Sequence, residues 1–212
     1  MKIATNHFQF SIFNFQLKMI AIIDYDAGNV KSVQNALKKL GFEAVITSDI
    51  ETIRNADKVI FPGVGEASSA MKKLKERGLD TIIPNLKQPV LGICLGMQLM
   101  CNASEEGKTK ALGIFDCEVK LFPNSDIVPH MGWNNVSEMK GKLFENISET
   151  DNFYFVHSYY AEIGESTTSV CYYITPFSAT LEKDNFYAVQ FHPEKSGDAG
   201  FKLLENFLNL RF

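Results

Sequence analysis

A cysteine stands between two glycines in the segment GICLG, residues 92 to 96. This G-x-nucleophile-x-G form is typical of a nucleophile elbow, in which Gly92 and Gly96 let a strand and a helix approach closely around a sharp turn. Cys94 would then lie at the N-terminus of the helix, where unpaired N–H groups and the helix dipole stabilise a thiolate. A small buried cysteine is a common structural alternative, and the pentapeptide alone leaves both interpretations open.

A histidine and a carboxylate suited to assist such a nucleophile lie in YAVQFHPEKS, residues 187 to 196. His192 and Glu194 are two positions apart, so an extended backbone turns both side chains to one side. A cysteine nucleophile needs a base that takes its proton and later gives a proton to a leaving amine, and a carboxylate that orients the base. A lone histidine is more often structural, but the combination predicts a catalytic site of Cys94, His192 and Glu194.

A glycine-rich loop follows a third apolar run in VIFPGVGEA, residues 59 to 67. Glycine lets its peptides adopt orientations that other residues resist, so Gly63 and Gly65 could aim backbone N–H groups at a developing oxyanion. Turns are glycine-rich in general, so the loop is weak evidence by itself. It is too short for a phosphate-binding loop and lacks the lysine of one.

The elements that must position these residues alternate along the first half of the chain. Apolar runs predict strands at 19–25, 43–48, 57–63 and 88–93, and helical spacing of apolar residues predicts helices at 29–42, 66–78 and 96–104. This alternation indicates crossover connections and a mainly parallel sheet. In such sheets the chemistry lies beyond the carboxyl ends of the strands, where Cys94 and the glycine loop fall.

From about residue 111 the residue pattern predicts mainly strands, at 115–122, 134–139, 153–163, 169–175, 177–182 and 186–191. A final helix is predicted at 198–210. The predicted fold class is α/β: three layers, with a mainly parallel central sheet, helices on both faces and an antiparallel or mixed β extension packed on the same sheet. We expect residues 19–212 to form a single domain. Residues 1–18 are interrupted by polar side chains and read as an N-terminal extension outside the core, not as a signal peptide or a membrane span.

Composition narrows the possible partners. The chain has 212 residues, 45% of them hydrophobic and 22% charged, and a formal net charge of −4, which argues against nucleic acid or an anionic membrane as the main partner. Its four cysteines show no CxxC pair and no metal-ligand spacing, so we expect a reducing, cytoplasmic compartment and no metal or cofactor.

Taken in order, PGVG, GICLGMQ and FHPE resemble the class I glutamine amidotransferases, whose glutaminase domains use a Cys-His-Glu triad. The resemblance covers nearly everything from Met19 to the C-terminus. The segments DYDAGN, PHMGWNNV, FVHSYY and HPEKS are similar to the glutaminase subunits of imidazole glycerol phosphate synthase. PHMGWN and the lysine after His-Pro-Glu favour this branch over the anthranilate, GMP and carbamoyl phosphate synthases.

The resemblance implies a role for each matching residue. Cys94 would attack the side-chain amide of L-glutamine to give a glutamyl thioester and ammonia, with His192 as base and then acid, and Glu194 as its orienter. The remaining roles are backbone donors of an oxyanion hole (Val64, Gly65, Leu95), glutamine binding (Gln98, Glu106, Ser158) and a face toward a partner (Met131, Trp133, Tyr154, Lys195). The alternatives are a helix-surface glutamine and a solvated acidic cluster for Gln98 and Glu106, and simple core packing for Trp133 and Tyr154.

The resemblance also implies a partner, a cyclase subunit resembling a (β/α)8 barrel, bound as a heterodimer. That subunit would use the ammonia to make imidazole glycerol phosphate and AICAR in histidine biosynthesis. Such a barrel takes typically about 250 residues, more than this chain holds. We expect hydrolysis to be slow alone and to rise with the partner and its nucleotide substrate, through reorientation of the Gly63–Val64 peptide.

The chain departs from the family at one position near the site. The family usually has Asp-Tyr-Gly where this chain has Asp24, Tyr25 and Asp26, so the first loop could differ in shape or charge. Three other functions stay open at this point. They are a glutaminase for another synthase, a stand-alone hydrolase of the cysteine peptidase type and a silent binding module, the last disfavoured because a scaffold has no need of the whole triad.

Overall fold

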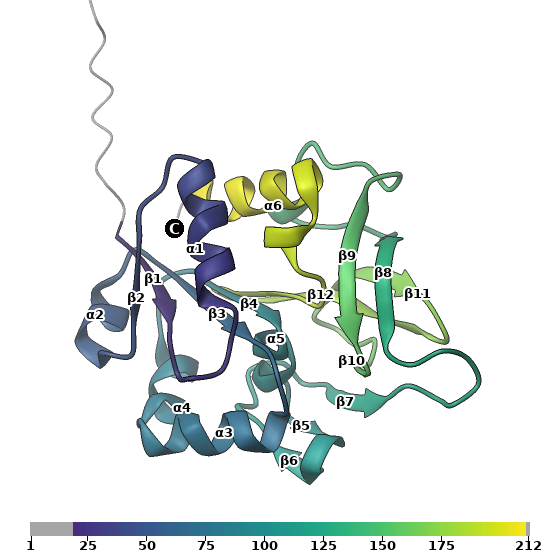
Figure 1. The fold of residues 1–212 in the computed structure, drawn as a ribbon, viewed down its shortest axis with the longest axis horizontal. Coiled ribbons are helices and arrows are strands. Elements are labelled where there is room, and N and C mark those ends of the chain that lie inside the picture. The colour runs from purple at the N-terminus through teal and green to yellow at the C-terminus, as the bar shows by residue number, and fades with distance from the viewer. Residues whose placement is uncertain (1–18, 211–212) are drawn as a thin grey trace, which may run out of the picture.

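The computed structural model describes residues 19–210, and its centre is a seven-stranded sheet in the order β11-β12-β13-β4-β3-β1-β2 (Figure 1). The predicted extension at 1–18 lies outside the described residues. In chain order the elements are β1 (Ile20–Ile23), α1 (Val30–Lys39), β2 (Ala44–Thr47), α2 (Ile50–Asn55), β3 (Lys58–Gly63), α3 (Ala67–Glu76), α4 (Leu79–Ile82), β4 (Val90–Cys94), α5 (Leu95–Met100), β5 (Ala103–Ser104), β6 (Thr109–Lys110), β7 (Glu118–Leu121), β8 (His130–Asn135), β9 (Asn152–His157), β10 (Tyr159–Ala161), β11 (Thr167–Tyr172), β12 (Pro176–Lys183), β13 (Phe186–Val189) and α6 (Gly197–Asn209).

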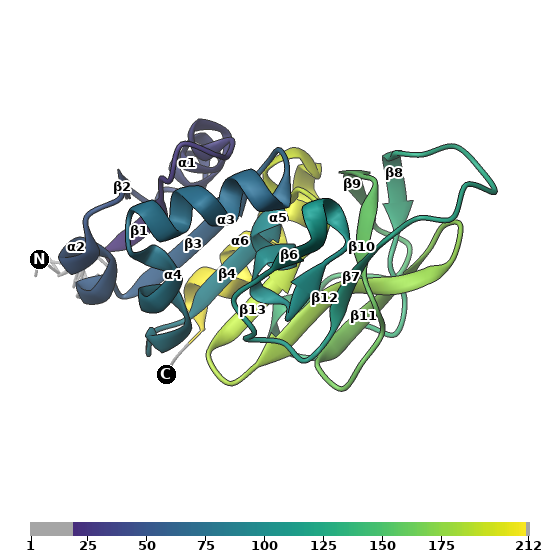
Figure 2. The same ribbon diagram turned by 90° about the horizontal axis from the view of Figure 1, so that it is seen from below.

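Helices cover both faces of the central sheet, as the alternating pattern predicts (Figures 1 and 2). Every residue of β1 is buried because successive side chains enter opposite cores. Ile20 and Ile22 pack with α1 and α6 on one face, whereas Ala21 and Ile23 pack with α2, α3, α4 and α5 on the other. The strands β2, β1, β3, β4 and β13 are parallel, β12 pairs antiparallel with β13, and the edge strand β11 pairs antiparallel with β12. The predicted α/β class with a mainly parallel sheet is therefore confirmed.

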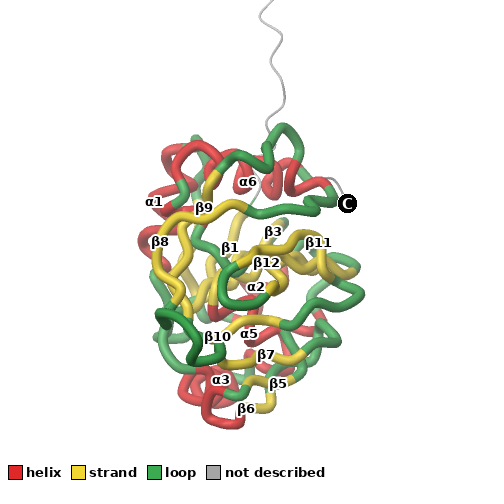
Figure 3. Tube along the Cα trace, turned by 90° about the vertical axis from the view of Figure 1, so that its right-hand side faces the viewer, coloured by secondary structure: helices red, strands yellow, loops and turns green. Residues whose placement is uncertain are grey.

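The β extension is divided more finely than the sequence indicates. Of the described strands after residue 111, β11, β12 and β13 join the central sheet. β10, β7, β5 and β6 form a second sheet, and β8 pairs with β9 in a separate two-stranded ribbon (Figure 3). The predicted strand at 153–163 breaks at Ser158, so that β9 pairs with β8 whereas β10 pairs with β7. The strand predicted at 134–139 lies instead at His130–Asn135, because this segment pairs residue by residue with Asn152–His157.

The helix after Cys94 is shorter than predicted. α5 ends at Met100 rather than near 104, because Ala103 leaves the helix to pair with Lys110 of β6 and Glu118 of β7. The short helices α2 and α4 were not predicted, since one or two turns give too little apolar periodicity. α2 does have a local start signal, as the Asp49 side chain accepts a hydrogen bond from the Thr52 backbone N–H at 2.8 Å.

No helix within residues 19–210 has the length and apolar character needed to cross a membrane.

Candidate active site

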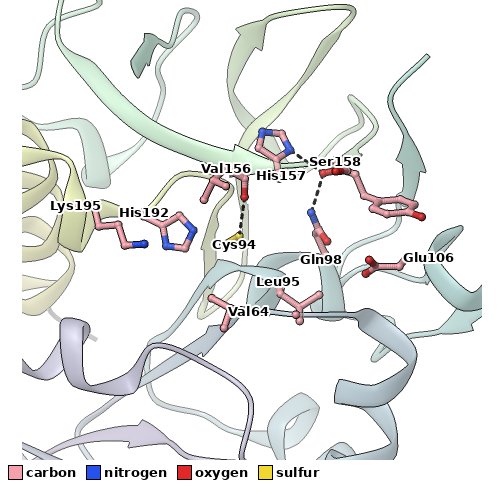
Figure 4. A pocket seen from close by; sticks show the side chains of 12 residues that line it. Val64, Cys94, Leu95, Gln98, Glu106, Val156, His157, Ser158, His192 and Lys195 are labelled. Carbon is pink, nitrogen blue, oxygen red and sulfur yellow. Dashed lines mark hydrogen bonds between the residues drawn. The ribbon is translucent and has the colours of Figure 1, made fainter. Parts of the chain in front are cut away.

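The carboxyl ends of three neighbouring strands bring the predicted catalytic residues together. Gly63 at the end of β3 lies opposite Cys94 at the end of β4, and Val189 of β13 lies opposite Ile93. The chain then continues from β13 to His192 and Glu194. A cavity of about 290 Å³ opens at this point (Figure 4), lined by Val64, Gly65, Cys94, Leu95, Gln98, Glu106, Val156, His157, Ser158, Tyr159, His192 and Lys195.

Cys94 sits in a strained turn between β4 and α5. Its backbone has φ 55° and ψ −111°, a region that non-glycine residues rarely occupy and that costs about 1–3 kcal/mol. The flanking glycines permit the turn, because a Cβ at Gly96 would overlap the Phe61 carbonyl oxygen and one at Gly92 would overlap the Met100 sulfur. The Cys94 side chain reaches the cavity with little exposure, 7% for the residue. The structure thus has the elbow that the pentapeptide predicts.

His192 lies beside Cys94 (Figure 4), and Glu194 holds the ring through its other nitrogen. Its Nδ1 donates to Glu194 Oε1 at 2.9 Å, and both side chains are almost fully buried. Its Nε2 is buried without a hydrogen-bond partner among residues 19–210, which leaves it available to the sulfur. Burial favours the neutral ring, but the nearby Cys94 sulfur and the hydrogen bond and charge of Glu194 outweigh it and raise the pKa of His192 to about 10. This arrangement favours a protonated imidazole beside the Cys94 sulfur at neutral pH.

Replacing Glu194 by glutamine is expected to lower kcat for glutamine hydrolysis by roughly 10²- to 10⁴-fold, because the imidazole loses its orienting charge. The pKa of His192 should also fall. The form with a protonated imidazole is then lost at a lower pH, so the alkaline limb of the kcat/KM profile should move toward neutrality. Steady-state rates across pH for wild type and Glu194→Gln test this; an unshifted alkaline limb would contradict the proposed pairing.

The three residues predicted to hold glutamine all line the cavity, but two of them have further contacts. The Gln98 side chain is buried, and its Nε2 donates to the Tyr159 carbonyl oxygen at 2.8 Å and to Gln190 Oε1 at 3.0 Å. Glu106 Oε2 accepts the Ala67 backbone N–H at 2.8 Å, at the start of α3. Burial raises the pKa of Glu106 and the nearby Glu66 charge adds to this, against the Ala67 hydrogen bond. The positive charge of a bound ammonium group would favour the ionised form of the Glu106 carboxyl group.

Val156, His157 and Tyr159 also line the cavity and were not predicted as site residues. Cys94 Sγ donates a long contact of 4.0 Å to the Val156 carbonyl oxygen, and the Gln190 amide donates to the same sulfur at 3.8 Å. The segment FVHSYY contributes to the family resemblance, but its sequence contains no local signal that the strand breaks at Ser158. The break separates Val156 and His157 of β9 from Tyr159 of β10.

A chain of hydrogen bonds behind the cavity wall holds two histidines neutral. His157 Nδ1 donates to the Tyr159 carbonyl oxygen at 2.8 Å, which fixes Nε2 as an acceptor for His130 Nδ1 at 3.1 Å. His130 Nε2 can then accept from the Asn134 amide at 3.5 Å. Burial lowers the pKa of His157 to about 3 and that of His130 to about 4. Protonation of either ring would break this chain.

The buried histidine pair predicts a loss of stability in acid. In the unfolded chain residue 157 becomes protonated near pH 6.5, whereas in the folded chain it stays neutral down to about pH 3. The free energy of unfolding should therefore fall as the pH falls through this window. For one such group the free energy of unfolding changes by at most about 1.4 kcal/mol per pH unit. The free energy of unfolding is measured by urea titration between about pH 6 and about pH 4. It should depend less steeply on pH for His157→Gln than for wild type. Parallel slopes would contradict the neutral chain.

The four residues predicted to face a partner lie next to the cavity. Met131 and Trp133 are 63% and 57% exposed, so core packing is excluded for Trp133. Trp133 lies opposite Tyr154 in the ribbon, with ring centroids 5.9 Å apart, and Lys195 lies over the Tyr154 ring. The cluster therefore connects an exposed aromatic surface to a lysine that also lines the cavity.

Asp26 keeps the glycine-like shape of the first loop. Its φ is 60°, in the left-handed region where glycine is favoured and aspartate is tolerated. Its carboxylate pairs with Arg77, and Lys73 Nζ donates to its carbonyl oxygen at 2.6 Å. The aspartate side chain thus changes the charge of the loop and anchors it to Arg77, the residue after α3, whereas the bond from Lys73 is made to the backbone.

Comparison with known proteins assigns the class. Residues 21–210 match the family described as Glutamine amidotransferase class-I. A solved glutamine amidotransferase superposes with a TM-score of 0.69 at 20% identity, over 89% of this chain and 96% of its own, and PurLQS from Thermotoga maritima does so with 0.69 at 16% identity, over 91% and 98%. At these identities the likeness shows the fold alone. The chain belongs to the class I glutamine amidotransferases.

The curated relatives are more specific. Imidazole glycerol phosphate synthase subunit HisH from Bacteroides fragilis strain YCH46 is 59% identical, over 90% of this chain and 99% of the relative. The protein of the same name from Vibrio parahaemolyticus is 47% identical, and HisH 2 of Methanococcus maripaludis is 49% identical, each over 90% of this chain and 98% of the relative. The branch predicted from PHMGWN and from the lysine after His-Pro-Glu is therefore confirmed.

Proposed function

We propose that this chain is a glutaminase that hydrolyses L-glutamine to glutamate and ammonia and delivers the ammonia to a cyclase subunit of imidazole glycerol phosphate synthase. The observation that carries the proposal is the convergence of Cys94, His192 and Glu194 at one cavity, in a chain whose relatives bear that name. The cyclase would make imidazole glycerol phosphate and AICAR, a step of histidine biosynthesis, in the cytoplasm.

The first half of the reaction forms a thioester. The Cys94 thiolate attacks the side-chain carbonyl carbon of glutamine, and the carbonyl oxygen becomes an oxyanion. Backbone N–H groups of Leu95 and of Val64 or Gly65 are the proposed donors to this oxyanion, since all three residues line the cavity. The His192 imidazolium then gives its proton to the leaving nitrogen, the C–N bond breaks, and ammonia departs.

The second half regenerates the enzyme. Neutral His192 takes a proton from water, which attacks the thioester carbon and expels the Cys94 thiolate, so that glutamate is released. Glu194 holds the imidazole through Nδ1 in both halves of the reaction. Glu106 is the proposed partner of the substrate ammonium group, with Gln98 and Ser158 as further polar contacts.

The partner surface we propose is the exposed cluster of Met131, Trp133, Tyr154 and Lys195, facing a separate subunit resembling a (β/α)8 barrel in a heterodimer. Aromatic and methionine side chains are enriched in such interfaces. An interface beside the cavity keeps released ammonia from being protonated by bulk water on its way to the second site.

Glutamine hydrolysis should be slow for the isolated chain and rise by roughly 100- to 1,000-fold with the cyclase subunit and its nucleotide substrate. This is the range that one oxyanion-hole donor contributes to kcat, and the Gly63–Val64 peptide is the proposed donor that reorients in the complex. Glutamate release is measured for the chain alone, with the subunit, and with subunit and nucleotide; equal rates would overturn the gating.

The same assay separates the alternatives. Coupled formation of imidazole glycerol phosphate identifies the synthase, whereas stimulation only by a different synthase would reassign the partner. Cleavage of peptides or esters without preference for glutamine would indicate a stand-alone hydrolase, and absence of any Cys94-dependent turnover would indicate a silent module.

A further inference from the structure

Two cysteine sulfur atoms are in contact at the far end of the helix that begins after Cys94. Cys101 caps the C-terminus of α5, and its Sγ lies 3.4 Å from Sγ of Cys117, which precedes β7. Both are free thiols. Cys101 is fully buried, and its thiol also contacts the Met97 carbonyl oxygen at 3.5 Å, whereas Cys117 is partly exposed. One sulfur is therefore open to a reagent and the other is in reach of the first.

We propose that Cys101 and Cys117 form a redox-active dithiol, which a low-molecular-weight disulfide converts to an intramolecular disulfide.

The backbone already holds the two residues in a suitable position. The Asn102 N–H donates to the Cys117 carbonyl oxygen at 2.9 Å, and the next residues, Ala103 and Glu118, pair between β5 and β7. A disulfide bond is about 2.05 Å long, so the sulfur atoms must approach by about 1.4 Å. Side-chain rotation and a small shift of two neighbouring segments can supply this approach without unpairing the strands.

The two thiols differ in the way that a stepwise exchange requires. The hydrogen bond between the two thiols lowers the pKa of Cys117, against burial and the charges of Glu162 and Asp116. The same hydrogen bond, followed by burial, raises the pKa of Cys101. Because Cys117 is partly exposed and Cys101 is fully buried, Cys117 is the attacking thiolate and Cys101 is the resolving thiol.

The exchange balances without any other reactant. The Cys117 thiolate attacks one sulfur of the small disulfide, forms a mixed disulfide and releases one small thiolate. Cys101 then loses its proton and attacks the Cys117 sulfur, so the intramolecular bond forms and the second small thiolate leaves. The two small thiolates take up the protons of the dithiol. The product closes residues 101–117 into a covalent loop that contains Glu106, a cavity residue.

The test uses the full-length chain carrying Cys94→Ala, which removes the catalytic thiol. The protein is incubated with oxidised glutathione, denatured, alkylated and analysed by mass spectrometry. We expect loss of two alkylatable thiols and of about 2 Da, with a peptide linking Cys101 to Cys117. Cys171 should remain alkylated, because burial raises its pKa to about 12 and it is fully enclosed.

Two single variants in the same background distinguish the roles. Cys101→Ser should stop at a glutathione adduct on Cys117, whereas Cys117→Ser should leave Cys101 unmodified. The proposal is overturned if the parent stops at the Cys117 adduct, or if both thiols stay fully alkylatable while the Cys101→Ser variant reacts. It is equally overturned if neither the parent nor Cys101→Ser reacts, since Cys117 is then closed to the reagent.

Discussion

Replacing Cys94 by alanine is expected to lower glutamate release from glutamine by roughly 10⁴-fold or more, the scale seen when other hydrolases lose their nucleophile. The sulfur is the atom that His192 flanks and that the cavity exposes, and an alanine methyl group cannot form the thioester. The fold should persist, because alanine occupies less space in the same turn. Release is measured with cyclase subunit and nucleotide present, so that the reference rate is at its highest.

The matched control is Cys171→Ala, which removes a buried thiol from β11. It should retain nearly all activity although it leaves a small cavity. Near-native ellipticity with no turnover for Cys94→Ala would assign the loss to chemistry. Residual turnover within about tenfold of wild type would overturn the role of Cys94, since no nucleophile removal is that mild.

Gly96→Ala should destabilise the fold by about 3 kcal/mol or more, because overpacking against backbone has no flexible side chain to absorb it. The added Cβ would overlap the Phe61 carbonyl oxygen and come within 3.0 Å of its carbon, so α5 or β3 must move. Either movement displaces the Leu95 N–H and the Cys94 turn. Activity should therefore fall even in the molecules that remain folded.

Gly164→Ala is the matched control, since its Cβ would meet only the Asp116 carbonyl oxygen, at 3.8 Å. Urea unfolding of both variants gives the comparison. A Gly96→Ala protein within about 1 kcal/mol of wild type would show that strand and helix are less closely packed than we describe.

The central sheet and the meeting of Cys94, His192 and Glu194 could be predicted because each depends on short stretches of sequence. The apolar run of β1 and the helical spacing of α1 specify their elements locally, and the elbow needs only Gly92, Cys94 and Gly96 in the order that the chain has them. Parallel strands then place Cys94 and the His192 loop at one edge without further information.

What could not be predicted depends on pairing between distant segments. No local sequence signal near Ser158 indicates that the strand stops pairing with β8 and that the next residues pair with β7. The end of α5 is likewise set by the pairing of Ala103 with β6 and β7. The histidine chain likewise depends on residues 130 and 157 becoming neighbours across the ribbon. Glu106 matched a family position for glutamine binding, but its bond to the start of α3 has no local signal.

The two-stranded ribbon separates two kinds of evolutionary constraint. Along β8, buried His130 alternates with exposed Met131 and Trp133, so one face of the strand belongs to the cavity wall and the other to solvent or a partner. In the function we propose, the outer face selects the partner subunit, so a mutation there changes binding without repacking the inner face. Partner selection and the chemistry proposed for Cys94 are then carried by separate sets of side chains.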